Sequence, residues 1–306
     1  MSTDEPRPTT TLCLGEALVD LICERPIREL ADADAFVPYF GGAVANVAVT
    51  AARRGARVAL AGGAGADSWG QWLRDRLEDE GVELDFFDLV PSVPTPLALV
   101  AIDAEGEPRY EVHGEAIATV VHALGERLED AVGRAAALCF SSNTLVSAAE
   151  REVTMRARQL ALELGRPVIF DPNLRLHRWS SLADAAARAN ACVPGALLVR
   201  ATHAEAALMT GEEDAERAAE AFLKAGARLV VITLGSAGAM LRGELRADVP
   251  GVEVDVLSTV GAGDVLSGVL LARLALSGFY PSAVAAALRE AVVESARACL
   301  HWGALD

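Results

Sequence analysis

Residues 257–276 read LSTVGAGDVLSGVLLARLAL, which places an aspartate directly after Gly261-Ala262-Gly263, at the start of an apolar helical segment. Three small residues leave backbone amides uncovered, and the positive end of the helix dipole points toward the same place. A helix start of this kind attracts anions. Because Asp264 is itself an anion, we expect it either to cap the helix or to act on a group bound beside it.

The composition of the chain limits the classes of protein to consider. Its 306 residues suffice for one large α/β domain with an insertion, and 52% of them are hydrophobic. The formal net charge of −16 makes nucleic acid and anionic membranes poor partners. No apolar segment is long enough to span a bilayer, and five scattered cysteines without a CxxC pair indicate a cytoplasmic protein with reduced thiols. The five histidines lack the spacing of a zinc site.

The sequence excludes three common nucleotide-binding motifs. Lys224, the single lysine, lies at a helix end, so the chain has neither a Walker A lysine nor the strand lysine of protein kinases. A dinucleotide-dependent oxidoreductase needs GxGxxG after the first strand, and residues 13–20 read CLGEALVD. Any bound phosphate must therefore be held by local amides, arginines or a metal.

Short apolar runs alternate with helical patterns along most of the chain. This alternation predicts a parallel sheet with helices on both faces. We expect buried strands at residues 11–22, 56–63, 136–142, 166–172, 195–200 and 227–235. We expect helices at residues 43–54, 68–80, 147–164, 179–192, 214–225, 261–276 and 281–300.

Two segments, residues 19–40 and 94–113, break this alternation. The second has a hairpin pattern around a turn on Asp103-Ala-Glu-Gly106. We expect the two segments to pair into a small β sheet that projects as a lid. The predicted organisation is one α/β domain over residues 11–306 that carries this lid, after a disordered leader of residues 1–10.

A second glycine cluster, FGGAVANVAVTAARRG at residues 40–55, follows a strand-like run and opens a helix. Asn46 lies one turn into this helix, on the side of Gly41 and Gly42. Its amide can donate to and accept from a polyol hydroxyl, while the glycines let a ligand approach the backbone. A tight turn with a tolerated polar residue explains these residues equally well.

Polar residues also follow the strands that precede Asn173 and Thr202. Arg175, in DPNLR, can clamp a phosphate or pair with a surface carboxylate. Thr202 and Glu205 are spaced to hold a hydrated Mg²⁺, but on spacing alone a helix capping box is the better explanation. The run VITLGSAGA at residues 231–239 ends a strand in a glycine turn that suits a nucleotide or a hairpin.

In their order along the chain, these motifs resemble those of the ribokinase-like (PfkB) carbohydrate kinases. GGAVANVA is similar to the N-terminal signature of that family and STVGAGD to its C-terminal signature, and the resemblance covers Gly15 to Gly303. It implies a three-layer sandwich with a central, mostly parallel sheet and a small β-sheet lid. It also implies an ATP-dependent sugar kinase that uses Mg²⁺, in which lid closure excludes water.

The resemblance implies a role for each motif. Asp264 takes the place of the catalytic base. Phosphoryl transfer to an alcohol needs a base for the hydroxyl proton and groups that stabilise the charge on the phosphoryl oxygens. We expect the adjacent amides to keep Asp264 ionised. The resemblance implies catalytic roles for Asp264, Gly261, Ala262, Gly263 and Arg175. It implies sugar binding by Asp20, Gly41, Gly42, Asn46 and Asn173, and nucleotide binding by Thr233, Gly235, Gly238, Gly261 and Gly263. Glu205 is the residue that it links to Mg²⁺.

Three positions depart from the pattern of the family. Ser258 stands where an acid is usual in a region that often helps to bind a monovalent cation, which argues against potassium activation. Thr202 replaces the usual Asn of the Asn-x-x-Glu element, so the water structure around Mg²⁺ is expected to differ. Val292 stands where many relatives place an Asn near the adenine, which favours loose base specificity.

The opening GEALVDLI and the segment SSNTL at residues 141–145 favour the fructokinase branch. The alternatives are a 2-keto-3-deoxygluconate kinase, a nucleoside kinase, and a catalytically silent sugar-binding protein derived from a kinase. The sequence does not identify the sugar.

The first strand of the lid hairpin is apolar on both faces. One face can close over the sugar, and the other needs a cover, which a second copy of the chain can supply. Relatives in the resembled family often pair through their lids. We therefore expect a homodimer that contacts through the lid. The two faces carry Leu97, Leu99 and Ala101, and Ala98, Val100 and Ile102, respectively.

Overall fold

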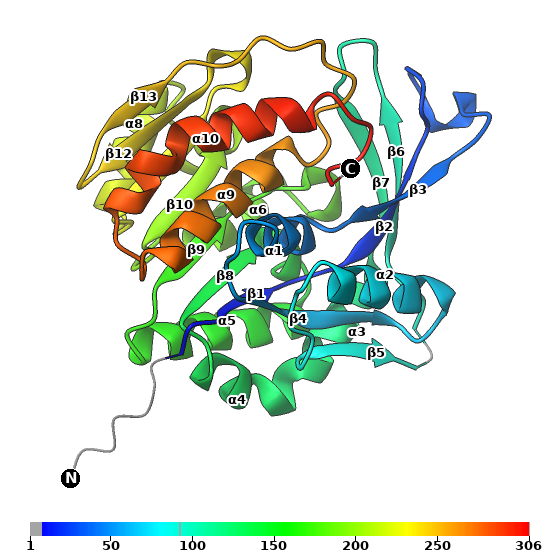
Figure 1. The fold of residues 1–306 in the computed structure, drawn as a ribbon, viewed down its shortest axis with the longest axis horizontal. Helices are drawn as coiled ribbons and strands as arrows, with labels where there is room; N and C mark the ends of the chain where they lie inside the picture. The colour runs from blue at the N-terminus through cyan, green and yellow to red at the C-terminus, as the bar shows by residue number, and fades with distance from the viewer. Residues whose placement is uncertain (1–7, 92, 306) are drawn as a thin grey trace.

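A computed structural model describes residues 8–91 and 93–305 (Figure 1). Most of the predicted leader, residues 1–7, lies outside the described residues. Within the described part, no helix is both long enough and apolar enough to cross a bilayer.

The central sheet has nine strands in the order β13-β12-β11-β10-β9-β8-β1-β4-β5. The strands from β11 to β5 run parallel, and β12 and β13 add an antiparallel edge. The predicted mostly parallel sheet is confirmed. The strands are β1 Thr11–Leu14, β4 Val58–Gly65, β5 Phe87–Val90, β8 Ala137–Ser141, β9 Val168–Asp171, β10 Leu198–Thr202, β11 Leu229–Thr233, β12 Ala239–Gly243 and β13 Ala247–Val249.

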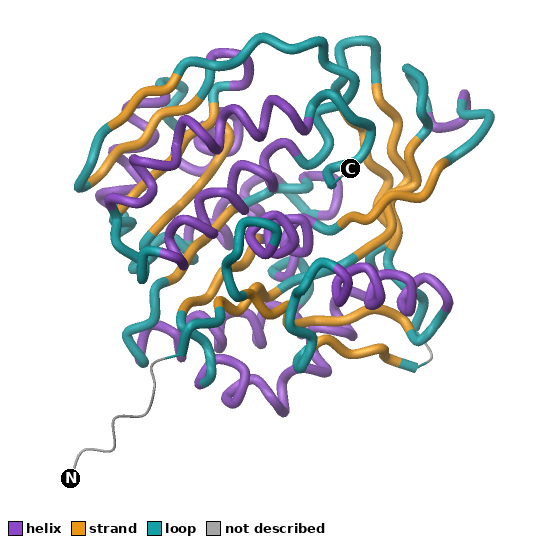
Figure 2. The backbone as a smooth tube through the Cα atoms, in the orientation of Figure 1, coloured by secondary structure: helices purple, strands orange, loops and turns teal. Residues whose placement is uncertain are grey.

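Helices cover both faces of this sheet, so the molecule has three layers (Figures 1 and 2). One face packs against α1 Ala43–Ala52, α2 Ser68–Asp79, α9 Ala262–Leu276 and α10 Ser282–Ala298. The other packs against α3 Glu115–Ala123, α4 Leu128–Gly133, α5 Ala148–Glu163, α6 Leu182–Asn190, α7 His203–Thr210 and α8 Ala215–Lys224. Short 3₁₀ turns lie at η1 Leu30–Asp32, η2 Leu124–Arg127, η3 Ser142–Thr144, η4 Leu176–Arg178 and η5 Gly235–Ala237.

Alternation along the strands separates two cores. In β1, Leu12 and Leu14 belong to the core beneath α5, whereas Cys13 belongs to the core beneath α1 and α9. Successive side chains of a strand point to opposite faces, and a strand buried on both faces therefore reads as an uninterrupted apolar run. This explains why the strand runs of the sequence lack polar alternation.

The prediction of one strand over residues 11–22 is wrong. The run contains β1 and a second strand, β2 Leu18–Ile22, which belong to different sheets. The break falls at Gly15, where β4 passes so closely that a side chain at Gly62 would lie 2.1 Å from the Gly15 carbonyl oxygen. Helices α3 and α4 and strands β5 and β13 were not predicted, and the hairpin that was one explanation of residues 231–239 is present as β11 and β12.

The two interrupting segments form a separate four-stranded sheet in the order β3-β2-β6-β7. It adds β3 Val37–Gly41, β6 Leu97–Ile102 and β7 Pro108–His113 to β2. The β6–β7 turn is the predicted one: the Asp103 carboxylate accepts hydrogen bonds from the amides of Glu105 and Glu107, and Gly106 has φ +84°. The sheet stands beside the main body, next to the C-terminal segment (Figure 1).

The expectation that one face of this sheet lacks a cover is wrong. Ala98, Val100 and Ile102 pack with Val260 on one side. On the other side, Ala101 packs with Cys23 and Ile27, supported by partly buried residues up to Phe36. Leu97 packs against the main core, so only Leu99 among the three residues of that face belongs to no core cluster. The chain itself covers most of this face, so a second copy of the chain is not needed to cover it.

Candidate active site

The start of α9 is built so that side chains are kept away from its amides. Gly261 is the N-cap, with φ +72°, and a Cβ there would lie 2.0 Å from the Cβ of Ala304. A Cβ on Gly263 would lie 2.7 Å from the guanidinium of Arg200. Gly261 therefore requires glycine, and a side chain at Gly263 would displace the Arg200 guanidinium. Residues 261–264 line a large cleft of about 1300 Å³.

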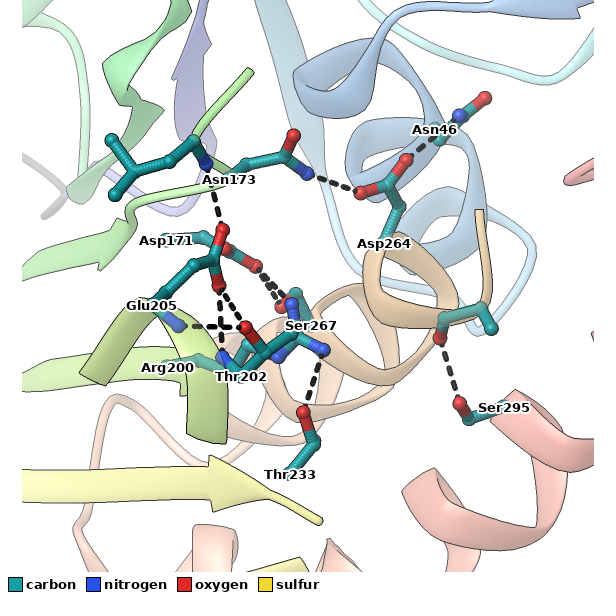
Figure 3. Close-up of polar contacts among 12 residues, drawn as sticks. Asn46, Asp171, Asn173, Arg200, Thr202, Glu205, Thr233, Asp264, Ser267 and Ser295 are labelled. Atoms are coloured by element: carbon teal, nitrogen blue, oxygen red, sulfur yellow. Dashed lines mark hydrogen bonds and ion pairs between the residues drawn. The ribbon is translucent and has the colours of Figure 1, made fainter. Parts of the chain in front are cut away.

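Asp264 is held by two asparagines from distant parts of the chain (Figure 3). Asn46 Nδ2 donates to its Oδ2 at 2.9 Å, and Asn173 Nδ2 donates to its Oδ1 at 2.9 Å. Asn46 comes from α1, and Asn173 follows β9. Asn173 has φ +42°, a left-handed conformation that is rare for residues with a side chain. The two amides fix the orientation of the carboxylate at the start of α9.

The expectation that backbone amides keep Asp264 ionised is wrong. Burial raises its pKa to about 7 from an ordinary value of 3.8, against the opposing charge of Arg175 and the hydrogen bond from Asn46. Asp264 is only 4% exposed, and its hydrogen bonds come from the two asparagine side chains. A carboxyl group with a pKa near neutrality is suited to accepting and releasing a proton.

Asp20, from β2, lies close to the predicted glycine pair. It is 5% exposed, and burial raises its pKa to about 7. A Cβ on Gly41 would lie 2.3 Å from Asp20 Oδ2, and one on Gly42, whose φ is +101°, would lie 2.6 Å from the Glu16 carbonyl oxygen. The glycines thus give Asp20 its space beside α1. No hydrogen bond from the described residues reaches the Asp20 carboxylate.

Asp20 and Asp264 line a second, small pocket of about 40 Å³, which has room for a few water molecules. The small pocket also contacts Gly42 and Asn46. It adjoins the large cleft, since four residues line both: Tyr110, Arg175, Gly261 and Asp264. Asp264 therefore stands where a small polar compartment opens into a large one.

Arg175 is placed at this junction by an aromatic contact. Its guanidinium lies 4.8 Å from the centre of the Tyr110 ring, which comes from strand β7 of the small sheet. Desolvation by burial raises the pKa of Tyr110, so its hydroxyl stays protonated. Arg175 thus carries a positive charge to the boundary of the two compartments and links the main body to the small sheet.

Thr202 and Glu205 form the predicted capping box of α7. Glu205 Oε2 accepts hydrogen bonds from the Thr202 amide at 2.8 Å and its hydroxyl at 2.9 Å, while Oε1 accepts from the Leu174 amide at 2.7 Å (Figure 3). Glu205 thereby fixes the backbone next to Asn173. Among the described residues, no group of three or more His, Cys, Asp or Glu side chains could hold a metal. Glu205 lines the cleft, so it offers a bound cation one carboxylate.

The far part of the cleft is formed by the β11–β12 hairpin and α10. Thr233, Gly235 and Gly238 line it, as does Val292. Gly238 has φ +102°, and a Cβ there would lie 2.1 Å from the Val249 carbonyl oxygen. The VITLGSAGA turn is therefore a hairpin and a wall of the cleft at once.

Sequence reasoning missed Arg200, which lies beneath the glycine turn. It is 5% exposed, and it donates to Asp171 Oδ2 at 3.3 Å and to Thr233 Oγ1 at 3.2 Å (Figure 3). Ser267 of α9 donates to the same Asp171 oxygen at 2.6 Å. A buried arginine inside a strand was the available signal. Glu16, Tyr110, Asn143 and Arg178, which line the small pocket, were missed as well.

Comparison with known proteins agrees with this geometry. A family model described as "pfkB family carbohydrate kinase" matches residues 9–298. The chain belongs to this family. The predicted family, fold class and sugar-kinase activity are thereby confirmed.

This pfkB-family chain is similar to several kinases of known identity. It is 31% identical over 270 residues to fructokinase-1 of Oryza sativa subsp. japonica, with 88% of this chain and 84% of the rice protein covered. The structure of Vibrio cholerae O395 fructokinase in its fructose, ADP and calcium ion bound form matches at 29% identity with a TM-score of 0.84, covering 97% and 94% of the chains. Salmonella enterica aminoimidazole riboside kinase matches at 27% identity and 0.79, covering 97% and 95%.

Proposed function

We propose that this pfkB-family kinase transfers the γ-phosphoryl group of ATP to a hydroxyl group of fructose. The observation that carries the proposal is the position of Asp264 at the boundary between the small pocket and the large cleft. The small pocket has the polarity to bind hydroxyl groups of a sugar that extends into the large cleft, and the cleft has the size for a nucleotide. The similarity to fructokinases from rice and Vibrio cholerae supports fructose as the sugar.

Asp264 is the proposed base. It takes the proton of the attacking sugar hydroxyl, and Asn46 and Asn173 hold its carboxylate in one orientation. The amides of Gly261 and Gly263 and the guanidinium of Arg175 stabilise the charge on the transferring phosphoryl group, whereas the Ala262 amide already donates to the Thr259 carbonyl oxygen at 3.2 Å. Asp20 accepts a hydrogen bond from another sugar hydroxyl, because no described residue donates to it.

Bound together with ATP, Mg²⁺ would supply positive charge that neutralises the phosphates. Mg²⁺ commonly keeps several waters and uses one or two carboxylates together with substrate phosphates, and Glu205 fits that requirement. Both Glu205 oxygens already accept hydrogen bonds, from the amides of Leu174 and Thr202. We therefore propose that Glu205 would contact Mg²⁺ through water molecules and not directly. Thr233, Gly235 and Gly238 are the proposed nucleotide contacts.

ADP release tests the proposal. Fructose should support ADP release well above the rate with ATP alone, and the D264N variant should lose this activity while it still binds an ATP analogue. 2-Keto-3-deoxygluconate and aminoimidazole riboside in the same assay test the alternative acceptors. Release with none of these compounds, together with sugar binding by calorimetry, would identify a catalytically silent sugar-binding protein.

Lid closure and assembly belong to the same proposal. The small sheet carries Asp20 and Tyr110 at the sugar pocket, so its movement would open and close that pocket. A cytoplasmic homodimer that contacts through this sheet stays a prediction, supported by its exposed edge strand β7 and by Leu99. Light scattering that shows a monomer at micromolar concentration would remove the dimer.

A further inference from the structure

Arg200, which the mechanism above does not use, places a buried cation in the wall of the large cleft. It lies inside β10, is 5% exposed, and lines the cleft together with Gly261, Gly263 and Asp264. A guanidinium keeps its charge in proteins, and burying a charge is costly. A buried cation at this place therefore calls for a physical reason.

The ion pair between Arg200 and Asp171 neutralises this charge only in part. One contact of 3.3 Å joins Arg200 Nη1 to Asp171 Oδ2, and the same oxygen accepts a 2.6 Å hydrogen bond from Ser267 (Figure 3). Arg200 Nε and Asp171 Oδ1 have no hydrogen-bond partner among the described residues. Burial also raises the pKa of Asp171, which disfavours its ionised form. A well-paired structural arginine would instead bind its carboxylate through two parallel hydrogen bonds.

The charged end of Arg200 faces the turn at the start of α9. A Cβ on Gly263 would lie 2.7 Å from both Nη1 and Nη2 of Arg200, and 3.0 Å from Cζ. It would be equally far from the two terminal nitrogens and further from the carbon between them. The guanidinium therefore points its terminal nitrogens at Gly263, directly beneath an amide that the proposed mechanism assigns to the phosphoryl group.

Contacts to both neighbouring strands hold the guanidinium at this place. It donates to Asp171 at the end of β9 and, through Nη2, to Thr233 Oγ1 at the end of β11, 3.2 Å away. These strands flank β10 and run parallel to it. A charge that is fixed before the reaction needs no reorganisation when negative charge develops beside it.

We propose that Arg200 is a positioning residue for phosphoryl transfer, which supports the Gly263 turn and adds a fixed positive charge beneath the phosphate bound there. The inference rests on the proposed function and deepens it, because the charge acts on the same phosphoryl group across Gly263. The competing explanation is an ion pair that only ties β10 to its neighbours.

Two variants of Arg200 separate its charge from its shape. R200K keeps a positive charge without the planar fork, and R200M keeps a long side chain without a charge. We expect kcat to fall about 10- to 100-fold in R200M, the effect of one nearby charge at an effective dielectric constant of about 20. R200K should keep kcat within about fivefold of the wild type, and the KM for fructose should stay within about twofold in both. Calorimetry should show weaker binding of the ATP analogue AMP-PNP to R200M than to R200K.

R242K and R242M are the matched controls. Arg242 is 7% exposed, lies in β12 and pairs with Glu216 and Asp248, yet it lines neither pocket. R242M should be less stable than the wild type in urea titrations, as R200M should be, but it should keep kcat within about twofold. Equal kcat in R200M and R200K, or an equal loss of kcat in R200M and R242M, would overturn the proposal.

D171N decides the question if R200M fails to fold. It removes the carboxylate charge, keeps an oxygen that can accept from Arg200 and Ser267, and leaves the positive charge in place. We expect affinity for AMP-PNP at least equal to that of the wild type and kcat within about threefold. A folded D171N whose kcat is lowered tenfold or more would show that the ion pair is needed, and would overturn the role of the charge. Failure of the proposed function looks different, because the wild type would then release no ADP with fructose.

Discussion

The Asp264 carboxylate accepts a 2.9 Å hydrogen bond from Asn173, a residue whose own backbone is held at φ +42°. The neighbouring Leu174 amide is tied to Glu205, so the left-handed residue is fixed from its C-terminal side. Strained backbone persists where the surrounding structure over-determines it. The strain here aims one amide group at the proposed base.

Replacing Asp264 by Asn should abolish turnover. We expect kcat to fall by about 10²–10⁴, because the variant cannot accept the hydroxyl proton. Shape is retained, since Asn46 or Asn173 can turn its unpartnered Oδ1 toward the new amide. Steady-state ADP release measures kcat, and calorimetry with an ATP analogue should show unchanged affinity. Near-normal kcat at saturating substrates would contradict the assignment.

The raised pKa of Asp264 predicts opposite effects of pH on activity and stability. Since the base must be ionised, kcat/KM should fall as the pH drops below about 7. The folded state holds the proton more tightly than the unfolded state, in which the pKa is near 3.8, so the free energy of unfolding should fall as the pH rises from about 4 to 7. At pH 8, D264N should exceed the wild type by on the order of 1–3 kcal/mol in urea titrations. A variant less stable than the wild type at pH 8 would argue against this pKa.

Asn173→Gly and Asn173→Ala form a matched pair. Both remove the amide that holds Asp264, so kcat should fall about tenfold or more in each. Glycine accepts φ +42° without strain, whereas alanine does not, and N173G should be more stable than N173A by about 1 kcal/mol. Thermal unfolding measures the difference. Equal stability of the two variants would show that the backbone relaxes.

Asn46→Ala should lower kcat and raise the KM for fructose, and it should leave nucleotide affinity unchanged. Asn46 lines the small pocket but not the large cleft, and it also orients Asp264. We therefore expect a fall in kcat as well as a rise in KM for fructose, each of about tenfold, from the loss of a hydrogen bond to a charged group. Equal loss of affinity for fructose and for an ATP analogue would instead indicate misfolding.

Potassium should not activate this kinase. Ser258 is fully buried, and its hydroxyl accepts from the Val260 amide at 3.1 Å, so the position offers one neutral, engaged oxygen. Potassium and sodium chloride at equal ionic strength should give kcat values within about twofold. A severalfold advantage for potassium would show that other groups supply the cation site.

Local motifs were sufficient to predict the parts of the site that lie in one segment. The glycines around Gly261, the Asp103 turn and the Thr202 capping box follow from residue type and spacing. Contacts between segments could not be predicted in this way. Arg200 meets Gly263, and Tyr110 meets Arg175, only because the fold brings together segments that are far apart in the chain. The pKa of Asp264 likewise depends on burial by the folded chain.

Parts of the fold also depend on contacts between distant segments and could not be predicted from local sequence. The run at residues 11–22 is mostly apolar, and its Gly15-Glu16 pair alone did not reveal that β1 ends there and β2 leaves for another sheet. That point depends on the close approach of Gly62 to Gly15. Strands β12 and β13 pair antiparallel at the sheet edge, and the helix-strand alternation that predicted the parallel strands has no place for them.

The contact between Asn46 and Asp264 joins residues 218 positions apart. During synthesis, the residues that line the small pocket and precede α4 leave the ribosome long before the segment that carries Asp264, the proposed base. Closing such a long loop is among the slow steps of folding. A nascent chain that stops before α9 contains most residues of the wall of the small pocket but lacks Asp264, the proposed base, so we expect phosphorylation only after α9 is in place.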